Sequence, residues 1–122
     1  VRTPTRRRRS TVVASGVGSV GGTGQCTYSV SRAGLGGMAR SITRELGGRG
    51  ITANLLAPGF IDTAMTASLP SDRQEAYRAA IPAGRFGAAD EVAGVVLFLA
   101  SDDASYISGA IIPVDGGLGM GH

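Results

Sequence analysis

The sequence predicts an α/β domain with a three-stranded parallel sheet and helices in the crossover connections. Three short runs, rich in β-branched or other apolar residues, lie at 11–15, 51–57 and 107–114 and have the composition of strands. Segments with helical periodicity lie between these runs, and strands that alternate with helices typically form a parallel sheet. The length of 122 residues, with 43% of them hydrophobic and 17% charged, suits one globular domain.

Residues 1–10 are expected to form a disordered, Arg-rich arm ahead of a folded part at 11–122. All 12 basic residues are Arg, and without Arg2 and the run Arg6–Arg9 the remaining chain is slightly acidic, so the net charge of +3 comes from the N-terminal tail. A basic tail can bind phosphate backbones. This tail has no interleaved aromatic residues, and the rest of the chain has no basic stripe. We therefore assign no nucleic-acid partner.

The first strand is expected at Thr11–Ser15, and the Gly-, Ser- and Thr-rich segment 16–24 follows it as a loop. A helix is predicted over Thr27–Leu46, ended by Gly47–Gly48 as C-cap residues. The apolar residues of this helix recur on one face, at Leu35, Met38, Ala39, Ile42 and Leu46. Ile51–Ala57 is predicted as the second strand, and its largely apolar sequence suits a strand covered on both faces.

The middle of the chain is expected to hold smaller elements. Residues 60–70 are predicted as a loop or a short helix. Ser71–Ala80 is predicted as a helix, because Ser71 and Gln74 have the spacing of a capping box. The segment 81–87, which contains Pro and Gly, is a turn-rich connection.

A strongly apolar helix is predicted over Asp90–Ser101. Its first residues, Asp90 and Glu91, carry negative charge that favours a helix N-terminus. Its inner face is formed by Val92, Val95, Val96 and Leu99. The last strand is expected within Ile107–Val114, and Asp115 after it is interpreted as a turn former.

Candidate chemistry lies at Tyr28, with Arg32 four residues later and Ser15 at the end of the first predicted strand. A phenol titrates near pH 10, so it needs a stabilised phenolate to act as an acid–base group near neutrality. A cation one helical turn away can supply that stabilisation. Ser15 could then hydrogen-bond a substrate carbonyl.

The remaining features limit the kinds of protein that fit. The single cysteine, Cys26, excludes an internal disulfide and suits a reducing cytoplasm. No apolar run reaches about 18 residues, so we expect no membrane span. The basic N-terminus is not followed by a secretory core segment. We assign no metal site.

Several motifs follow one another from about Val12 to the C-terminus. They are Ser15, Tyr28 with SxSR after it, RAGLGGMARSITREL, NLLAPGFIDTAM, GRFGAADEVAGVVLFLASDDASYISG and IIPVDGG. On these motifs the chain resembles the C-terminal half of the short-chain dehydrogenases/reductases. Within that family it is most similar to beta-ketoacyl-acyl-carrier-protein reductases. Its ending, VDGGLGMGH, is similar to that of the type that serves mycolic-acid elongation.

This resemblance implies a Rossmann-fold enzyme that passes a hydride from NADPH to a ketone. We also expect a homo-oligomer. The substrate that the resemblance implies is a ketoacyl thioester of acyl carrier protein or CoA, and the product is a hydroxyacyl thioester. It implies that Tyr28 protonates the developing alkoxide and that Ser15 polarises the carbonyl. Arg32 occupies the position of the family's lysine, which holds the nicotinamide ribose hydroxyls and lowers the pKa of the tyrosine.

The resemblance also implies two binding segments. The PGxxxT segment, which contacts the nicotinamide end of the cofactor, is matched by Pro58, Gly59, Ile61 and Thr63. The stretch from Met65 to Pro82 corresponds to a mobile substrate-binding region. The apolar residues of this stretch that suit an acyl chain are Met65, Leu69 and Tyr77.

Two departures from the family's pattern affect these expectations. The family's N-terminal half is expected to be missing, with its G-x-x-x-G-x-G phosphate loop and its catalytic asparagine. The run GVGSVGGTG does not replace that loop, because it precedes the helix that carries Tyr28. At Arg32, arginine keeps the positive charge of lysine, but its flat fork is not a point charge on a flexible stem.

Three functional interpretations therefore stay open. The first is a ketoacyl reductase represented by its catalytic half, which we expect to be inactive alone. The second is a truncated, non-catalytic fragment that only associates with a full-length relative. The third is a reductase of another ketone or alcohol.

Overall fold

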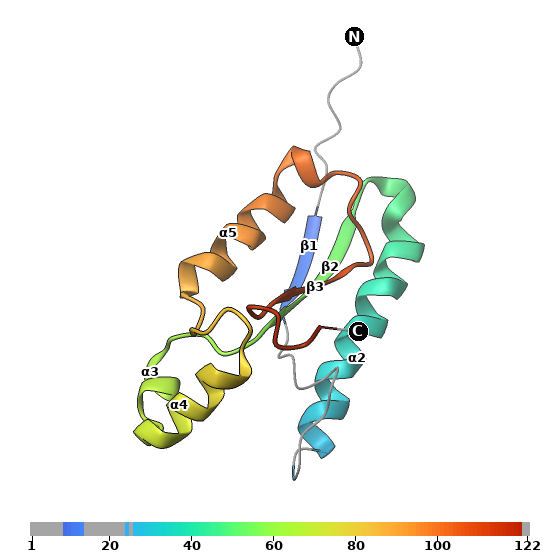
Figure 1. The fold of residues 1–122 in the computed structure, drawn as a ribbon. Coiled ribbons are helices and arrows are strands. Elements are labelled where there is room, and N and C mark those ends of the chain that lie inside the picture. Colours follow the sequence, from blue (N-terminus) through green and yellow to red (C-terminus); the bar gives the residue numbers. More distant parts are fainter. Residues whose placement is uncertain (1–8, 14–23, 25, 121–122) are drawn as a thin grey trace.

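The computed structural model describes residues 9–13, 24 and 26–120, and within these it does not describe the side chains of 9–13 and of Tyr28. The larger elements are β1 (Arg9–Val13), α2 (Cys26–Leu46), β2 (Thr52–Pro58), α3 (Ala64–Ala67), α4 (Ser71–Ala80), α5 (Ala89–Ala100) and β3 (Ile111–Val114). Two short 3₁₀ helices, η1 (Gly47–Arg49) and η2 (Asp102–Ala104), follow α2 and α5. The predicted alternation of strands and helices is confirmed (Figure 1).

The strands pair in the order β1-β2-β3, and both pairings are parallel, as the sequence predicts. In the register, Val12 lies opposite Leu55, and Leu56 lies opposite Ile112. Residues 52–57 of the central strand β2 are all buried. These residues are largely apolar because both faces of the strand are covered, as the sequence predicts.

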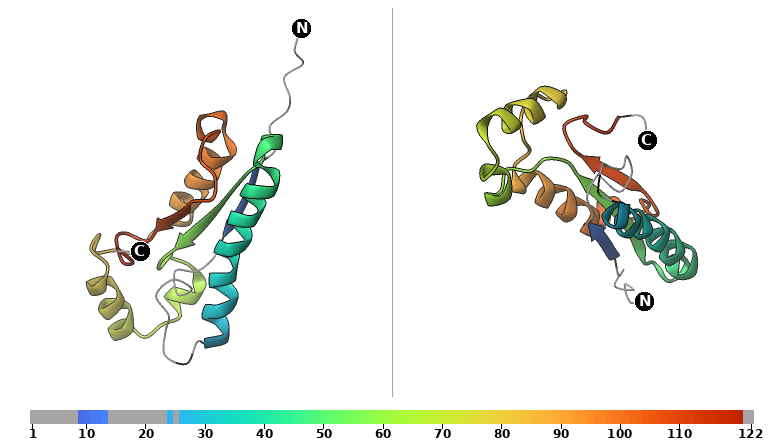
Figure 2. Two further views of the ribbon diagram at one scale, coloured as in Figure 1. Left: turned by 90° about the vertical axis from the view of Figure 1, so that its right-hand side faces the viewer. Right: turned by 90° about the horizontal axis from the view of Figure 1, so that it is seen from below.

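Helices cover the two faces of the sheet, so the molecule has three layers (Figure 2). On one face α2 packs on β2 and β3, since a Cβ placed on Gly36 would lie 3.7 Å from Leu55 Cδ2 and 3.6 Å from Ile111 Cδ1. On the other face the neighbouring residue of β2, Leu56, is fully buried in a cluster with Leu99 of α5. This alternation follows from the two-residue repeat of a strand.

The two crossover connections have opposite hands. Both carry the chain to the next strand in the same direction across the sheet, yet α2 and α5 lie on opposite faces (Figure 2). The β1-α2-β2 connection is right-handed, as nearly all such connections are. The β2-α5-β3 connection is therefore left-handed, which is rare.

The first strand begins earlier than predicted. Arg9 and Ser10, which the sequence assigns to the arm, pair with Thr52 and Ala53 of β2. The pairing with β2 extends the strand toward the N-terminus despite the basic residue at its start. Ser15 and residues 1–8 lie outside the described residues, so the predictions made for them stay predictions.

Helix α2 ends at Leu46 as predicted, but the two glycines after it do not form the left-handed cap. Gly47 opens the 3₁₀ helix η1, and Gly50 adopts the left-handed conformation with a φ of 74°. Its N–H donates to Gly47 O over 3.0 Å. The cap therefore lies one short helical turn beyond the position that the sequence suggested.

The capping box predicted for α4 is wrong, although the helix bounds are as predicted. Pro70 is the N-cap residue, and no side chain caps this helix. The amide of Gln74 reaches back and donates to Leu69 O over 2.9 Å. It therefore ties α4 to the loop before it.

The last strand lies within Ile107–Val114, as predicted, and occupies its second half, Ile111–Val114. Gly109 has a φ of 73°, which breaks the extended conformation before Ile111. The side chain of Asn54 bonds both sides of this break, donating to Ile107 O over 3.0 Å and accepting from Ala110 N over 3.1 Å. Asn54, on the central strand, therefore holds residues 107–110, the approach to β3, in place.

Helix α5 lies within one residue of its predicted bounds, and its predicted inner face is largely confirmed. Leu99 is buried, and Val95 and Val96 pack against the cluster around it. None of the helices in the described part of the chain combines the length and apolarity needed to cross a bilayer.

Candidate functional site

The carboxyl ends of the strands lie at the same end of the molecule as the first turns of α2 and the helices α3 and α4 (Figure 1). This arrangement follows from a parallel sheet whose crossover helices run antiparallel to the strands. In open α/β sheets, ligands bind in the crevice outside the carboxyl ends of the strands. Segment 58–63, which the resemblance predicts to bind the cofactor, begins at this end, where β2 finishes.

A cleft of about 290 Å³ opens where β2 and β3 end. It is lined by Phe60, Arg85, Gly87, Glu91 and residues 113–117. The cleft therefore combines one aromatic ring, one cation and two carboxylates with the backbone of a glycine-rich turn.

Gly59 brings the end of β2 against the end of β3. Its N–H donates to Val114 O over 3.0 Å. A Cβ placed on Gly59 would lie 2.7 Å from the Cβ and 2.9 Å from the Cα of Asp115. The backbone after Pro58 thus has no room for a side chain at this position.

Ile61 joins the segment after β2 to the segment before α5. It forms a parallel bridge with Gly87, in which Asp62 N donates to Gly87 O over 2.7 Å and Gly87 N donates to Phe60 O over 2.9 Å. The carbonyl of Ile61 accepts from Thr66 Oγ1 over 3.0 Å. No hydrogen bond within residues 9–13, 24 and 26–120 uses the N–H of Ile61, so this donor is available to a ligand.

Thr63 begins the short helix α3. Its N–H donates to Thr66 Oγ1 over 2.9 Å, whereas Thr66 N reaches Thr63 Oγ1 only at 3.5 Å, which is long for a hydrogen bond. The Thr63 side chain is exposed. Its hydroxyl can therefore bond a ligand without breaking a strong internal bond.

The three predicted acyl-contact residues differ in their surroundings. Met65 is 80% exposed on α3, and Leu69 is half-buried in the loop after it. Tyr77 of α4 stacks on Phe60, with ring centroids 4.4 Å apart and planes at 26°. One face of the Tyr77 ring is therefore occupied, and this stacking holds α4 beside the segment that follows β2.

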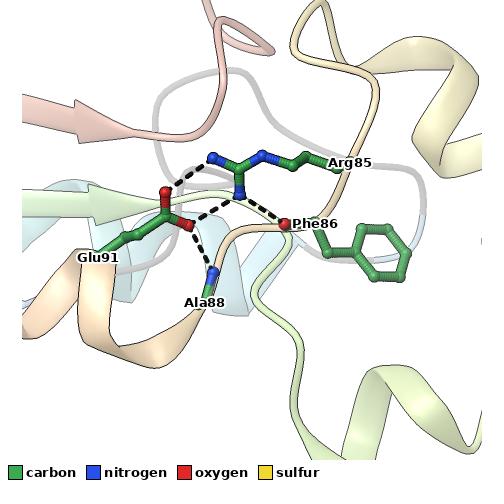
Figure 3. Close-up of polar contacts among 4 residues, drawn as sticks. All are labelled: Arg85, Phe86, Ala88 and Glu91. Atoms are coloured by element: carbon green, nitrogen blue, oxygen red, sulfur yellow. Dashed lines mark hydrogen bonds and ion pairs between the residues drawn. The ribbon is translucent and has the colours of Figure 1, made fainter.

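A charged cluster that the sequence patterns did not indicate lies at the rim of the cleft (Figure 3). Arg85 donates from Nη1 to Oε2 of Glu91 over 2.9 Å and from Nη2 to Oε1 over 2.8 Å. Oε2 also accepts from Ala88 N over 2.7 Å. The bond from Arg85 is the larger cause, and that from Ala88 the next, of a lowered pKa of Glu91, at about 2. One sequence signal could have revealed part of this cluster. Glu91 stands three residues after Ala88, which precedes α5, and a glutamate at this spacing often bonds the N–H of the capping residue.

The predicted catalytic group is described only in part. Tyr28 and Arg32 lie one turn apart near the start of α2, and the side chain of Arg32 is half-buried. Ser15 and the Tyr28 side chain are not described. Their grouping with Arg32 therefore stays a prediction.

Two polar residues near the site are structural. Asp115 accepts from the N–H groups of Gly117 and Gly119, each over 2.9 Å, which confirms that it forms the turn after β3. Asn54 is 1% exposed, and both polar atoms of its side chain bond residues 107–110, which lead to β3. Among the described residues, no group of three or more His, Cys, Asp or Glu side chains could hold a metal ion.

A second cavity, of about 530 Å³, lies at the amino ends of the strands. Two of its hydroxyls are engaged within the fold, since Thr43 Oγ1 lies 2.9 Å from Ser108 Oγ and Ser108 Oγ accepts from Ala53 N over 3.1 Å. These bonds join α2, β2 and the approach to β3. The cavity wall is therefore explained by the packing of these elements.

Comparison with known proteins connects this site to an enzyme family. The family model described as Enoyl-(Acyl carrier protein) reductase matches residues 3–119. The chain is 58% identical over 110 residues to the 3-oxoacyl-acyl-carrier-protein reductase MabA of Mycobacterium tuberculosis (strain H37Rv), covering 87% of this chain and 44% of that protein.

Two reductases named FabG give the same result. The chain is 52% identical over 108 residues to that of Pseudomonas aeruginosa, covering 88% of this chain and 44% of that protein. It is 47% identical over 115 residues to that of Escherichia coli K12, covering 94% of this chain and 47% of that protein. The chain thus spans about half the length of these relatives.

Proposed function

Because the chain belongs to the short-chain dehydrogenase/reductase family, we propose that it carries the C-terminal, catalytic half of a Rossmann-fold ketoacyl reductase. The whole protein reduces a 3-ketoacyl thioester to a hydroxyacyl thioester. The observation that carries this proposal is the identity of 58% to a 3-oxoacyl-acyl-carrier-protein reductase across 87% of the chain. The position of the cleft at the carboxyl ends of parallel strands supports it.

The residues after β2 fit the nicotinamide end of NADPH. A carboxamide needs a donor and an acceptor, and the unused N–H of Ile61 and the exposed hydroxyl of Thr63 offer such groups on one short segment. Gly59 and Pro58 set the path of that segment from the sheet. We assign cofactor binding to Pro58, Gly59, Ile61 and Thr63, together with Tyr28 and Arg32.

In the proposed reaction, NADPH, when bound, would supply the hydride for the ketone carbon and would thereby become NADP⁺. Tyr28 donates its phenolic proton to the alkoxide oxygen that develops, which gives the alcohol. Ser15 donates a hydrogen bond to the same oxygen and polarises the carbonyl. Arg32 stabilises the phenolate and holds the ribose hydroxyls through its guanidinium donors.

The acyl chain is proposed to lie along the lobe formed by α3 and α4. Met65 offers an exposed, flexible thioether side chain, and Leu69 adds a half-buried apolar surface. Tyr77 contributes through the ring surface that the stack with Phe60 leaves open. The thioester carrier is acyl carrier protein, after which the relatives are named, or CoA.

The rest of the enzyme is proposed to add a strand beside β1. In the described sheet β1 pairs with β2 alone, so its outer edge carries unpaired backbone groups. Relatives more than twice as long have the residues to cover that edge and to hold the pyrophosphate. On this basis the residues from the start of β1 at Arg9 onward are the catalytic half of one domain, and the chain made alone is inactive.

The share of the relatives that the chain covers also favours a second candidate. A chain that covers 44% of a relative could be a non-catalytic fragment whose only role is to associate with a full-length reductase. A reductase of another ketone or alcohol is the third candidate. These candidates differ in whether the complete gene product turns over NADPH, and with which carbonyl compound.

The test is a reductase assay on the complete gene product, with acetoacetyl-CoA, an acyl-carrier-protein thioester and a simple ketone as substrates. We expect NADPH oxidation with the thioesters, lowered about 10²–10⁴-fold by Tyr28→Phe, because that change deletes the proton and keeps the ring. Tyr106→Phe is the matched control, since Tyr106 is fully exposed on the approach to β3. No turnover of any carbonyl compound, or full turnover by Tyr28→Phe, would refute the proposed chemistry.

A further inference from the structure

The carboxylate of Glu91 holds both ends of the short segment 85–88. It receives two hydrogen bonds from the guanidinium of Arg85 and one from the N–H of Ala88, all between 2.7 and 2.9 Å long (Figure 3). Arg85 also donates to Phe86 O over 3.2 Å. The segment is thus closed into a compact loop on a side chain of the first turn of α5.

This loop is larger than a helix cap needs. Capping α5 requires only the bond from Ala88 N to the Glu91 carboxylate. The planar, two-bond contact with Arg85 adds a geometric restraint, because a guanidinium and a carboxylate meet in one preferred orientation. The same contact engages Arg85, which lines the cleft, so its charge is matched by Glu91 rather than exposed to an anion.

Segment 85–88 contains Gly87, which contacts the residues that follow β2. Gly87 lies between Arg85 and Ala88, and it bridges Ile61 through two backbone hydrogen bonds of 2.7 and 2.9 Å. A Cβ placed on Gly87 would lie 3.0 Å from Ile61 Cδ1, so the side chain of Ile61 occupies the space beside Gly87. A displacement of 85–88 must therefore move residues 60–62.

We propose that Glu91 is a positioning residue for the cofactor-binding segment 58–63. Its carboxylate fixes 85–88, and the bridge between Gly87 and Ile61 transmits that position to the Ile61 N–H and to Thr63. The inference rests on the proposed function for the identity of the ligand. The mechanical link between Glu91 and Ile61 does not depend on the proposed function, because it rests on the hydrogen bonds alone.

The experiment compares Glu91→Gln with Asp90→Asn in the complete gene product. Both variants remove one carboxylate charge from the first turn of α5, but Asp90 lies outside the cluster. Arg85→Lys is a third variant, which keeps the positive charge but removes the planar guanidinium that donates two hydrogen bonds to Glu91. Two quantities are measured: amide hydrogen exchange of peptides over 59–63 and 85–88 without cofactor, and KM for NADPH beside kcat.

We expect Glu91→Gln and Arg85→Lys to speed exchange in both peptides and to raise KM for NADPH by roughly 2–5-fold, the range that an exposed ion pair supports. KM for the thioester should change less, and Asp90→Asn should change neither quantity. A merely structural role would instead lower the melting temperature and leave the exchange at 59–63 at its original rate.

Faster exchange at 85–88 with unchanged exchange at 59–63 would overturn the proposal, because the link to Ile61 would then be absent. An unchanged KM for NADPH would overturn it as well. Absence of reductase activity from the unmodified protein would refute the proposed function instead. In that case the exchange rates, which need no cofactor, still decide whether Glu91 positions 58–63.

Discussion

Gly59 lies against Asp115 with no space for a side chain between the ends of β2 and β3. A Cβ on Gly59 would lie 2.7 Å from Asp115 Cβ, closer than such atoms approach in proteins. Asp115 cannot move away easily, because its carboxylate accepts hydrogen bonds from Gly117 and Gly119. Gly59 and Asp115, the second of which lines the cleft, therefore fix each other's position.

Gly59→Ala is expected to destabilise the protein by about 1–3 kcal/mol, the usual cost of forcing an extra carbon into a packed site. Gly94→Ala is the matched control, since a Cβ on Gly94 of α5 would meet no atom within 4 Å. That change should stabilise the helix by about 0.5–1 kcal/mol. Urea unfolding measures both, and equal stability of the two variants would contradict the close approach.

Asn54→Ala is expected to destabilise the fold strongly, because Ile107 O and Ala110 N lose their partner inside the protein. The cost is about 1–3 kcal/mol for each buried group left unpaired. Asn54→Asp keeps the shape and the acceptor for Ala110 N, but it sets a second oxygen against Ile107 O. Thermal melting should therefore show both variants below the original protein. An Asp variant of unchanged stability would show that the bond to Ile107 contributes nothing.

The carboxyl group of Glu91 is expected to titrate well below the ordinary value for a glutamate side chain. The guanidinium of Arg85 and the N–H of Ala88 hold its folded pKa at about 2, below the ordinary value of 4.5. A lowered pKa means that its stabilising effect is complete above pH 4.5 and is lost as the pH falls toward 2. Arg85 faces this group, and Asp115 lines the same cleft.

Carbon-detected NMR of the side-chain carboxyls, recorded between pH 6 and 2, measures this titration. Arg85→Ala should return the Glu91 midpoint toward the ordinary value, because the main cause of its shift is gone. Asp90→Asn should leave the midpoint low. A midpoint near 4.5 in the unmodified protein would contradict the geometry of the cluster.

Arg32→Lys is expected to raise the turnover of the complete reductase. A compact ammonium on a flexible stem fits between a phenolate and two ribose hydroxyls, whereas the planar fork of arginine is wider. Steady-state kinetics with NADPH measures the change. Arg40→Lys is the control, as Arg40 is exposed two turns further along α2. Equal or lower turnover in the Arg32→Lys variant would show that arginine serves fully at this position.

Much of the fold could be predicted because its signals are local. The periodicity of α2 and the apolar sequence of β2 each depend on neighbours in the chain, and both elements lie within one or two residues of their predicted bounds. The start of β3 could not be predicted in the same way. It is set by the φ of 73° at Gly109 and by bonds to Asn54, which is more than fifty residues away in the sequence.

The candidate site shows the same limit. The PGxxxT pattern located the segment after β2, but not the bridge from Ile61 to Gly87 that fixes it. Arg85 and Glu91 are close in sequence, yet their contact depends on how the chain turns before α5. Composition and motif spacing carry no information on that turn.

The left-handed connection between β2 and β3 has a consequence for the order in which the protein folds. The β1-β2 pair can form once residues up to Pro58 are available, with α2 closing over it. β3 can pair with β2 only after residues 59–110 have been made and α5 has packed on the face of the sheet opposite α2. Bringing distant parallel strands together costs chain entropy before any contact compensates, and such topologies fold slowly. We therefore expect the docking of β3 to be the late, rate-limiting step, and this chain, folding alone, to pass through an intermediate in which only β1 and β2 are paired.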